Sequence, residues 1–172
     1  MLFRSDLFIE YFNQHPEVKL IIAPHVIDEN HLVEIIRKLK RPYVRYTRAN
    51  EKNVRKADCL IIDCFGLLSS IYRYGEIAYI GGGFGVGIHN TLEAAVYGIP
   101  VIFGPKYQKF QEAIQLLETK GAFSVKDYEE LKTLLDRMLT DEVFLRESGM
   151  NASNYVTSNA GATDKIMSMI NF

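Results

Sequence analysis

The sequence has little net charge and no long apolar run. Its 20 lysines and arginines nearly balance 21 acidic residues, which gives a formal net charge of -1. A chain with this balance has no basic field for nucleic acid, so a nucleotide would have to be held by local geometry. No stretch approaches the roughly 20 apolar residues of a membrane-spanning helix. The opening residues, MLFRSDLF, have one arginine and no apolar core of signal-peptide length, so we expect a soluble chain without a signal peptide.

Cysteine is scarce, and its placement argues against a disulfide. Cys59 and Cys64 bracket an apolar run that reads as a strand. Five residues of extended strand span about 16 Å, whereas a disulfide needs Cα atoms within about 7 Å. We therefore expect two buried thiols in a reducing compartment. No Cys or His spacing typical of a metal site accompanies them, so no metal is expected.

Two common nucleotide-binding motifs are also missing. The dinucleotide motif G-x-G-x-x-G fails at every start in the glycine-rich stretch, because its last position falls on Val86, Ile88 or Asn90. The P-loop motif fails because Gly87 is followed by isoleucine and histidine, where lysine and serine or threonine are needed. A dinucleotide-dependent dehydrogenase and a P-loop NTPase are therefore disfavoured.

The sequence does contain a regular alternation of apolar runs and amphipathic segments. Its 172 residues, 48% hydrophobic and 24% charged, suit one soluble domain. Strands are predicted at residues 18–23, 43–47, 59–63 and 122–125, helices at residues 28–40, 67–74, 111–120, 128–139, 141–159 and 163–169, and a β-loop-α-β unit at residues 77–105. This order predicts an α/β fold with a Rossmann-like parallel sheet flanked by helices.

The predicted helix at residues 28–40 shows how the pattern is read. Asp28 suits the N-cap, and an inward stripe follows at helical spacing, formed by Leu32, Ile35, Ile36 and Leu39. A basic cluster closes the helix, formed by Arg37, Lys38, Lys40 and Arg41, and a solvated helix end is an adequate explanation for it.

The strongest functional signal is the stretch IAYIGGGFGVGIHNTLEAAVYGIPVIFGP, residues 77–105. Its loop holds five of the chain's 12 glycines: Gly81, Gly82, Gly83, Gly85 and Gly87. A loop without Cβ atoms lets backbone N–H groups approach a ligand closely. The start of the next helix adds unpaired N–H groups and the positive end of the helix dipole. The loop is therefore a candidate phosphate site.

The helix after this loop offers polar side chains. Ile88, Leu92, Ala95 and Val96 follow the helical apolar period and should face the sheet, while His89 and Glu93 lie one turn apart on a flank beside Asn90. Glu93 can accept hydrogen bonds from two vicinal hydroxyls, so it is a candidate ribose ligand. The alternative is that His89 and Glu93 lie on a solvent-exposed flank without binding a ligand, where the helix dipole slightly stabilises the charge of Glu93.

Further candidates stand at the predicted carboxyl ends of strands, where open α/β sheets collect ligands. His25 follows the strand at residues 18–23 and could touch phosphate or sugar, although a histidine after a proline can equally be a loop hydrogen-bonder. Asp63 ends another strand, and we favour a structural role for it. Lys106 and Lys109 occupy the loop and first helical turn after Pro105, where cations oppose the dipole and an anionic contact or an ordinary surface position are both open.

The run GGGFGVGIHNTLEAAVYGIPVIFGPKYQKFQEA resembles the donor-nucleotide half of the 3-deoxy-D-manno-octulosonic acid (Kdo) transferases. The resemblance extends from about His15 to the C-terminus and is specific between Ile80 and Phe123. It implies the C-terminal half of a GT-B glycosyltransferase, with CMP-Kdo as donor, a lipid A precursor as acceptor, lipopolysaccharide biosynthesis as the pathway and no metal or other cofactor. In that family a histidine follows the strand that His25 follows, commonly beside an arginine that this sequence lacks.

The resemblance also implies what the chain lacks. Residues 1–172 are expected to form a single nucleotide-sugar-binding domain without the N-terminal acceptor domain, and the resemblance leaves open whether the first strand of the sheet is present. The family's general base lies in that N-terminal domain, so no catalytic residue is expected here and the chain alone should not transfer sugar. The whole enzyme would work at the cytoplasmic face of the bacterial inner membrane, and apolar surface left by the missing domain could drive self-association.

The leading hypothesis is thus a domain that binds a CMP-sugar. The glycine loop would hold the phosphate, Glu93 the ribose, the backbone from Gly81 to Phe84 the base, and Lys106 or Lys109 the carboxylate of Kdo. A UDP-sugar-dependent GT-B transferase or epimerase is the second reading. A non-catalytic nucleotide-binding module is the third.

Overall fold

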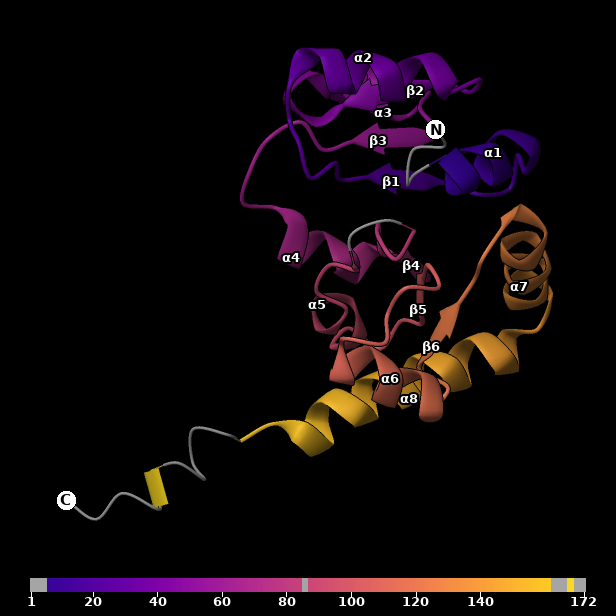
Figure 1. Cartoon of the computed structure of the whole chain (residues 1–172). Helices are drawn as coiled ribbons and strands as arrows, with labels where there is room; N and C mark the ends of the chain where they lie inside the picture. The colour runs from indigo at the N-terminus through magenta and orange to yellow at the C-terminus, as the bar shows by residue number, and fades with distance from the viewer. Residues whose placement is uncertain (1–5, 85–86, 162–166, 169–172) are drawn as a thin grey trace. The chain divides into compact units, whose positions relative to one another are not determined.

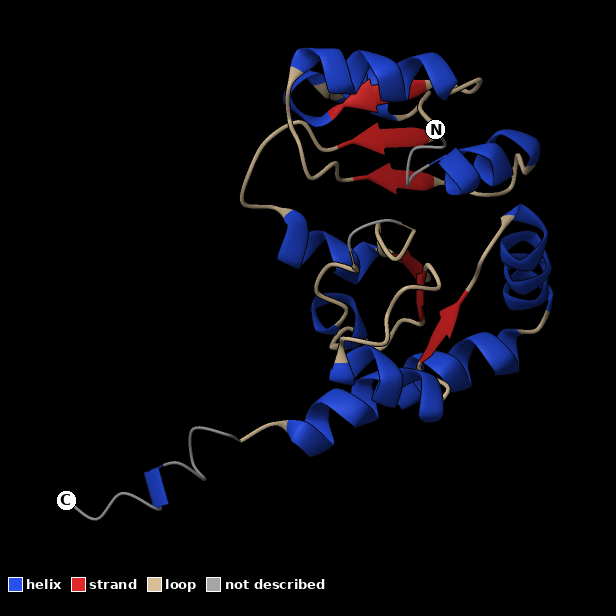
Figure 2. Cartoon of the chain, in the orientation of Figure 1, coloured by secondary structure: helices blue, strands red, loops and turns tan. Residues whose placement is uncertain are grey.

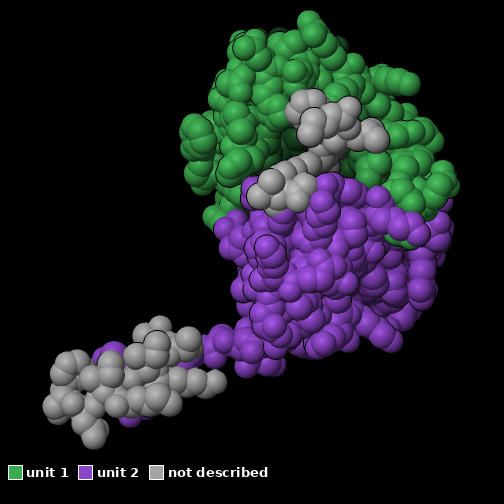
Figure 3. All heavy atoms as spheres, viewed as in Figure 1, with its two compact units in different colours: residues 1–75, 127–132 green, residues 76–126, 133–172 purple. Residues whose placement is uncertain are grey.

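The computed structural model describes residues 6–84, 87–161 and 167–168. The chain divides into two compact units (Figure 3), each described here by itself. The first unit holds residues 1–75 and 127–132, and the second holds residues 76–126 and 133–172. In the described part of the chain, no helix has both the length and the apolar character needed to cross a membrane.

The first unit is built on a three-stranded parallel sheet with the order β1-β3-β2 (Figure 1). Its strands are β1 (Leu20–Ile22), β2 (Tyr43–Arg45) and β3 (Cys59–Ile61), in the register Leu20–Cys59 and Tyr43–Cys59. The helices are α1 (Asp6–Gln14), α2 (Glu29–Lys38), α3 (Glu51–Val54) and α4 (Leu68–Ile71), with 3-10 turns at Tyr46–Arg48 and Tyr72–Tyr74.

The core of this unit joins α1 and α2 to the sheet. Its buried side chains are Ile9, Phe12, Leu20, Leu32, Ile35, Cys59 and Ile61. The predicted N-cap is confirmed, because Asp28 Oδ1 accepts a hydrogen bond from His31 N at 3.0 Å. Of the predicted inward stripe, Leu32 and Ile35 are buried, while Ile36 and Leu39 are partly buried. Both cysteines are free, as predicted, although Cys64 is only half-buried.

The basic cluster at the end of α2 is more than a solvated helix end, which corrects the simpler interpretation. The Arg41 guanidinium donates to the carbonyls of Phe12, His15 and Pro16 at 2.7–2.9 Å and stacks 4.0 Å from the Phe12 ring centre. Lys38 Nζ pairs with Asp6 Oδ1 at 2.6 Å. Arg41 therefore caps the carbonyl end of α1 and Lys38 holds its start, so two of the four cations fasten α1 to α2.

The second unit has its own parallel sheet with the order β4-β5-β6 (Figure 2). Its strands are β4 (Ala78–Tyr79), β5 (Val101–Phe103) and β6 (Ala122–Ser124). The helices are α5 (Leu92–Ala95), α6 (Gln111–Glu118) and α8 (Glu142–Asn159), and α7 (Tyr128–Thr140) crosses the division between the units. The described strands are all parallel and flanked by helices, which confirms the predicted fold class, but they form two sheets of three strands.

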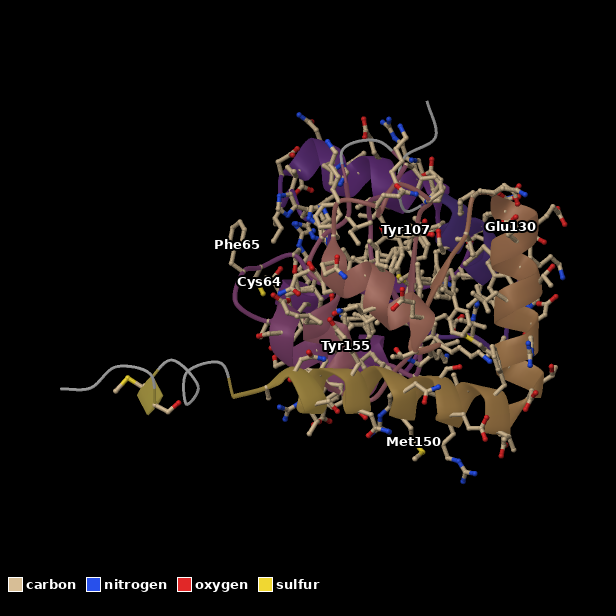
Figure 4. The ribbon with its side chains drawn as sticks, turned by 60° about the horizontal axis from the view of Figure 1, so that its bottom comes forward. Cys64, Phe65, Tyr107, Glu130, Met150 and Tyr155 are labelled. Carbon is tan, nitrogen blue, oxygen red and sulfur yellow. The ribbon has the colours of Figure 1, made fainter. Side chains whose placement is uncertain are left out.

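Helix α8 packs through small residues. A Cβ added to Gly149 would lie 2.1 Å from the Gly98 carbonyl oxygen, and one added to Gly121 would lie 2.7 Å from the Ala152 backbone. Tyr155, labelled in Figure 4, donates its hydroxyl to Gln115 Oε1 at 2.6 Å and so joins α8 to α6. The backbones are in direct contact at these two points. The position of α8 therefore requires glycine, which has no side chain, at both of them.

The substitution Gly149→Ala is expected to destabilise the chain by about 2 kcal/mol, because the new methyl group forces α8 away from Gly98. Urea unfolding followed by circular dichroism measures the change. Met150→Ala is the matched control: Met150 is 55% exposed and points away from the other elements in Figure 4. Its expected change is within about 0.5 kcal/mol. Equal stability of the two variants would contradict the close packing of α8.

Candidate functional site

The glycine-rich loop leaves β4 and folds back on itself. Gly82 and Ile88 form an isolated antiparallel bridge, and Gly83 N–H donates to the Gly87 carbonyl at 2.7 Å. The loop is thus a narrow hairpin, and at least one of its N–H groups serves the loop itself. Gly85, one of the predicted ligands, lies outside the described residues.

Three of the loop glycines are demanded by the loop's own packing. Gly82, Gly83 and Gly87 have φ values of +128°, +77° and +65°, which favour glycine. An added Cβ would lie 2.5 Å from the Gly87 oxygen at Gly82 and 2.6 Å from the Gly104 oxygen at Gly83. At Gly87 it would lie 2.7 Å from the Phe110 ring. These glycines are therefore needed whether or not a ligand binds.

Gly81 is different. Its φ lies outside the left-handed region, and apart from its two chain neighbours no described residue has an atom within 4 Å of the position where its Cβ would be. Neither backbone strain nor packing in the described structure requires glycine at this position. The open space at the carboxyl end of β4 is thus the part of the loop where a ligand has room.

The segment after the loop corrects the predicted helix. Helix α5 begins only at Leu92 and has four residues, so His89 and Asn90 precede it and Ile88 belongs to the hairpin. Val96, predicted to face the sheet, is 55% exposed. A helix this short adds little dipole, so phosphate recognition by a helix N-terminus loses its physical basis here.

The side chain of Asn90 explains where α5 starts. Its Oδ1 accepts from Leu92 N at 3.0 Å, and its Nδ2 donates to Glu93 Oε1 at 3.1 Å. This local pattern replaces helical hydrogen bonds and favours a late start. Asn90 and Glu93 are thus brought together, with Glu93 half-buried and His89 and Asn90 exposed. One carboxylate oxygen of Glu93 is already engaged by Asn90.

Thr91 was missed by sequence reasoning. Its side chain is completely buried, and its hydroxyl has no hydrogen-bond partner among the residues that the structure describes. A threonine next to polar neighbours gives no sequence signal of burial. The structure shows a buried hydroxyl directly between Asn90 and α5.

The loop after β5 packs on the glycine loop. Gly104 N–H donates to the Gly82 carbonyl at 3.2 Å, and Lys106 N–H donates to the Gly83 carbonyl at 2.8 Å. The Phe84 ring lies against Gly104, where an added Cβ would be 2.6 Å away. Figure 4 labels Tyr107, whose ring centre lies 5.6 Å from that of Phe103. The structure therefore joins Lys106 to the predicted glycine site through the backbone.

The lysines of this loop are exposed. Helix α6 begins at Gln111, so Lys106 lies in the loop as predicted, and Lys109 lies there too and not in a first helical turn. Neither side chain forms an ion pair with the described residues. Both ammonium groups are therefore available to an anion.

The remaining predicted candidate belongs to the first unit. His25 is exposed in the loop after β1, whereas the glycine loop and the lysines belong to the second unit. In the same unit, Figure 4 shows Cys64 and Phe65 on the loop after β3, where Phe65 is 82% exposed. No group of three or more metal-ligating side chains occurs within the described part of the chain.

Asp63 is the centre of a charged network that sequence reasoning saw only in part. Its carboxylate accepts from Arg45 Nε at 2.8 Å, Thr47 N at 2.9 Å and Thr47 Oγ1 at 2.6 Å, and its side chain is 1% exposed. Arg45 also donates to both carboxylate oxygens of Glu29 at 2.7 and 3.0 Å. Asp63 therefore fixes the loop after β2: its role is structural, as the sequence favoured, but it holds this loop and does not cap the following helix.

The network sets the charge state of Asp63. Burial acts to raise the pKa of the Asp63 carboxyl, but the hydrogen bonds from Thr47 and Arg45 outweigh it and lower that pKa from 3.8 to about 2. The carboxylate thus stays ionised at neutral pH.

Fold and site together define a class of protein: an α/β chain with parallel sheets and a glycine loop at a strand end, as in the C-terminal half of GT-B glycosyltransferases. Two solved structures share the fold. One is described as the C-terminal CMP-Kdo binding domain of WaaA from Acinetobacter baumannii, with TM-score 0.75, 18% identity and coverage of 90% of this chain and 81% of that one. The other is the C-terminal domain of a group 1 glycosyl transferase (LpcC) from Francisella tularensis, with TM-score 0.60, 16% identity and coverage of 91% and 77%.

Sequence similarity is more specific. The chain is 36% identical over 135 residues to 3-deoxy-D-manno-octulosonic acid transferase of Aquifex aeolicus, covering 77% of this chain and 37% of the relative. It is 28% identical over 157 residues to the transferase of that name from Chlamydia muridarum, covering 90% and 36%. The chain is a homologue of the Kdo transferases, which confirms the predicted resemblance. It spans only 36–37% of the length of these two relatives, and no family model matches it.

Acid should unfold the chain partly through Asp63. Because its pKa is lower in the folded state, its contribution is present above pH 3.8 and is lost as the pH falls towards 2. The variant Asp63→Asn should lose roughly 2 kcal/mol at pH 7 and show a weaker pH dependence of stability between these values. Thr47→Ser, which keeps the hydroxyl, is the control and should retain that dependence. Urea titrations at several pH values provide the measurement, and an unchanged pH dependence in Asp63→Asn would contradict the network.

Thr91 offers a test in the opposite direction. Thr91→Val removes a buried unpaired hydroxyl and keeps the volume, so it should stabilise the chain by about 1 kcal/mol. Thr91→Ser keeps the hydroxyl and removes a methyl group, and should destabilise it by about 1 kcal/mol. Thermal unfolding of both variants gives the comparison. A valine variant less stable than the original chain would show that the hydroxyl has a partner.

Proposed function

We propose that the chain is the donor-binding part of a glycosyltransferase that transfers Kdo from CMP-Kdo to a lipid A precursor in lipopolysaccharide biosynthesis. The carrying observation is the 36% identity to a Kdo transferase over 77% of the chain. The fold match to a CMP-Kdo binding domain supports the same donor. This similarity favours a CMP-sugar over the UDP-sugar and non-catalytic alternatives.

The donor site is proposed at the carboxyl end of β4. Loop N–H groups beside Gly81, where the described structure leaves open space, are proposed for the phosphate, and the backbone from Gly81 to Phe84 for the base. The free oxygen of Glu93 accepts from a ribose hydroxyl, with His89 and Asn90 beside it. Lys106 and Lys109 are unpaired with the described residues and suit the carboxylate of Kdo. Because α5 is short, the loop amides and these lysines supply most of the attraction for the phosphate.

We propose that this chain binds the donor and stabilises its leaving group, and that it does not activate the acceptor. Loop N–H groups and lysines would stabilise the negative charge that grows on the departing phosphate as the acceptor hydroxyl attacks the anomeric carbon. The attacking hydroxyl needs a general base, which we place in the part of the enzyme that this chain does not span. The proposed displacement uses no metal ion. The 172-residue chain should thus bind the donor without transferring sugar. His25 is proposed as a further contact to the donor. In the whole enzyme we place this domain at the cytoplasmic face of the bacterial inner membrane.

Glu93 is tested with two nucleotides. If Glu93 binds the ribose, the chain should bind CMP about tenfold more tightly than 2′-deoxy-CMP, and Glu93→Gln should reduce that ratio to near one. Isothermal titration calorimetry measures both affinities, with UDP as a third ligand. Glu118→Gln, at the exposed end of α6, is the matched control and should leave the ratio unchanged. Absence of CMP binding, or an unaltered ratio in Glu93→Gln, would remove the ribose assignment.

A substitution at Gly81 tests ligand binding without disturbing the fold. Gly81→Ala places a methyl group in open space, so stability should change by less than about 1 kcal/mol while CMP binding weakens at least tenfold. Gly83→Ala is the contrasting variant, because its Cβ would meet Gly104 at 2.6 Å, and it should reduce stability. Thermal unfolding and calorimetry on the same samples distinguish the two. Normal CMP affinity in a folded Gly81→Ala variant would place the phosphate elsewhere.

A further inference from the structure

One groove of the first unit is separate from every residue assigned to the donor. It is an open groove of about 740 Å³ and runs between α2 and the edge strand β2. Its apolar wall is formed by Val33 and Ile36 of α2 and by Leu39 directly after the helix, of which Ile36 and Leu39 also pack against the core. Pro42 and Tyr43 form the facing wall. The volume is within the range of ligand sites, about 300–1,000 Å³.

The strand side of the groove offers unpaired backbone. In the described sheet β2 has a neighbour on one side only, β3. Asp58 N and Cys59 N both donate to the Pro42 carbonyl, at 2.8 and 3.1 Å, so this carbonyl points towards β3. Backbone groups alternate along a strand, so the N–H and C=O of Tyr43 point the other way, to the open edge. Tyr43 is also 42% exposed, and an edge of this kind is a template for another strand.

The charges of the groove select the partner. Lys40, Arg41, Arg45 and Arg48 line it, and Glu29 is its single acidic lining residue. Glu29 is neutralised by Arg45, and Arg41 is engaged by the end of α1. Lys40 and Arg48 are exposed and form no ion pair with residues that the structure describes. A positive groove on a chain of net charge -1 favours an anionic occupant.

We propose that this groove binds an extended acidic segment of another polypeptide, which adds a strand to the free edge of β2. The backbone of the segment pairs with Tyr43, its alternate apolar side chains lie against Val33 and Ile36, and its carboxylates lie near Lys40 and Arg48. An open strand edge beside an apolar helix wall is the geometry of strand addition. An anionic membrane could interact with Lys40 and Arg48 but could not pair with the backbone of β2. The free strand edge therefore favours a polypeptide over a membrane.

The probe is an acetylated, fluorescein-labelled hexapeptide of alternating valine and glutamate, with a lysine-for-glutamate version as the charge control. Fluorescence anisotropy should show binding of the acidic peptide at least tenfold tighter than that of the basic one. Combining Lys40→Glu with Arg48→Glu should weaken the acidic peptide at least tenfold. Arg73→Glu, an exposed arginine outside the groove, should leave its affinity within twofold.

The strand edge is tested at Tyr43. Tyr43→Pro removes the outward N–H but none of the groups that face β3, and edge positions tolerate proline. It should weaken the acidic peptide at least fivefold, whereas Tyr43→Thr, which keeps the N–H, should weaken it less than twofold. Circular dichroism verifies that both variants are folded, and hydrogen exchange should show protection of the Tyr43 amide by the peptide.

Three outcomes would overturn the proposal. One is no binding of the acidic peptide, the second is equal binding to the Lys40→Glu/Arg48→Glu variant, and the third is tight binding to folded Tyr43→Pro. Binding of phosphatidylglycerol vesicles with no binding of the peptide would assign the groove to a membrane instead. The same variants are also titrated with CMP. Their CMP affinity should not change, which shows that the groove and the proposed donor site are separate.

Discussion

The structure of the second unit depends on backbone packing directly against backbone where β4 and β5 end. Gly82 and Gly83 lie against Gly87 and Gly104 at distances that no side chain would allow. Hydrogen bonds from Gly104 and Lys106 to the carbonyls of Gly82 and Gly83 hold the two loops together. The hairpin and the position of the loop after β5 follow from this contact, whereas Asn90 sets the late start of α5.

Because of this close packing, a glycine-rich loop is not by itself evidence for a ligand-binding site. Most of the described glycines in the loop are explained by the fold, so their number is weak evidence for a ligand. Gly81 carries more weight, because nothing in the described structure requires it. Glu93 likewise gains meaning from its neighbour: a carboxylate held by Asn90 is positioned before any ligand arrives, which reduces the entropy lost on binding.

The first unit has a comparable anchor in Arg45. It joins Asp63 after β3 to Glu29 at the start of α2, so one guanidinium ties the ends of β2 and β3 to the first residue of α2. At the other end Arg41 caps α1. Two arginines thus organise both ends of a small sheet whose strands have only three residues each. The cations that look like a solvated cluster in the sequence are therefore divided: Lys38 and Arg41 hold the fold, whereas Lys40 is exposed and forms no ion pair with the described residues.

Local patterns in the sequence determined much of this protein. Apolar runs and amphipathic periods predicted the strands and the long helices, Asp28 predicted its cap, and the run from Gly81 to Ala113 predicted the relationship to Kdo transferases. These features depend on neighbours a few residues away. Tertiary structure alone decided the pairing of Arg45 with Asp63, the demand for glycine at Gly83 by Gly104, the burial of Thr91 and the free edge of β2. Each of these is set by chain segments that meet in space without being adjacent in sequence, and no local pattern contains that information.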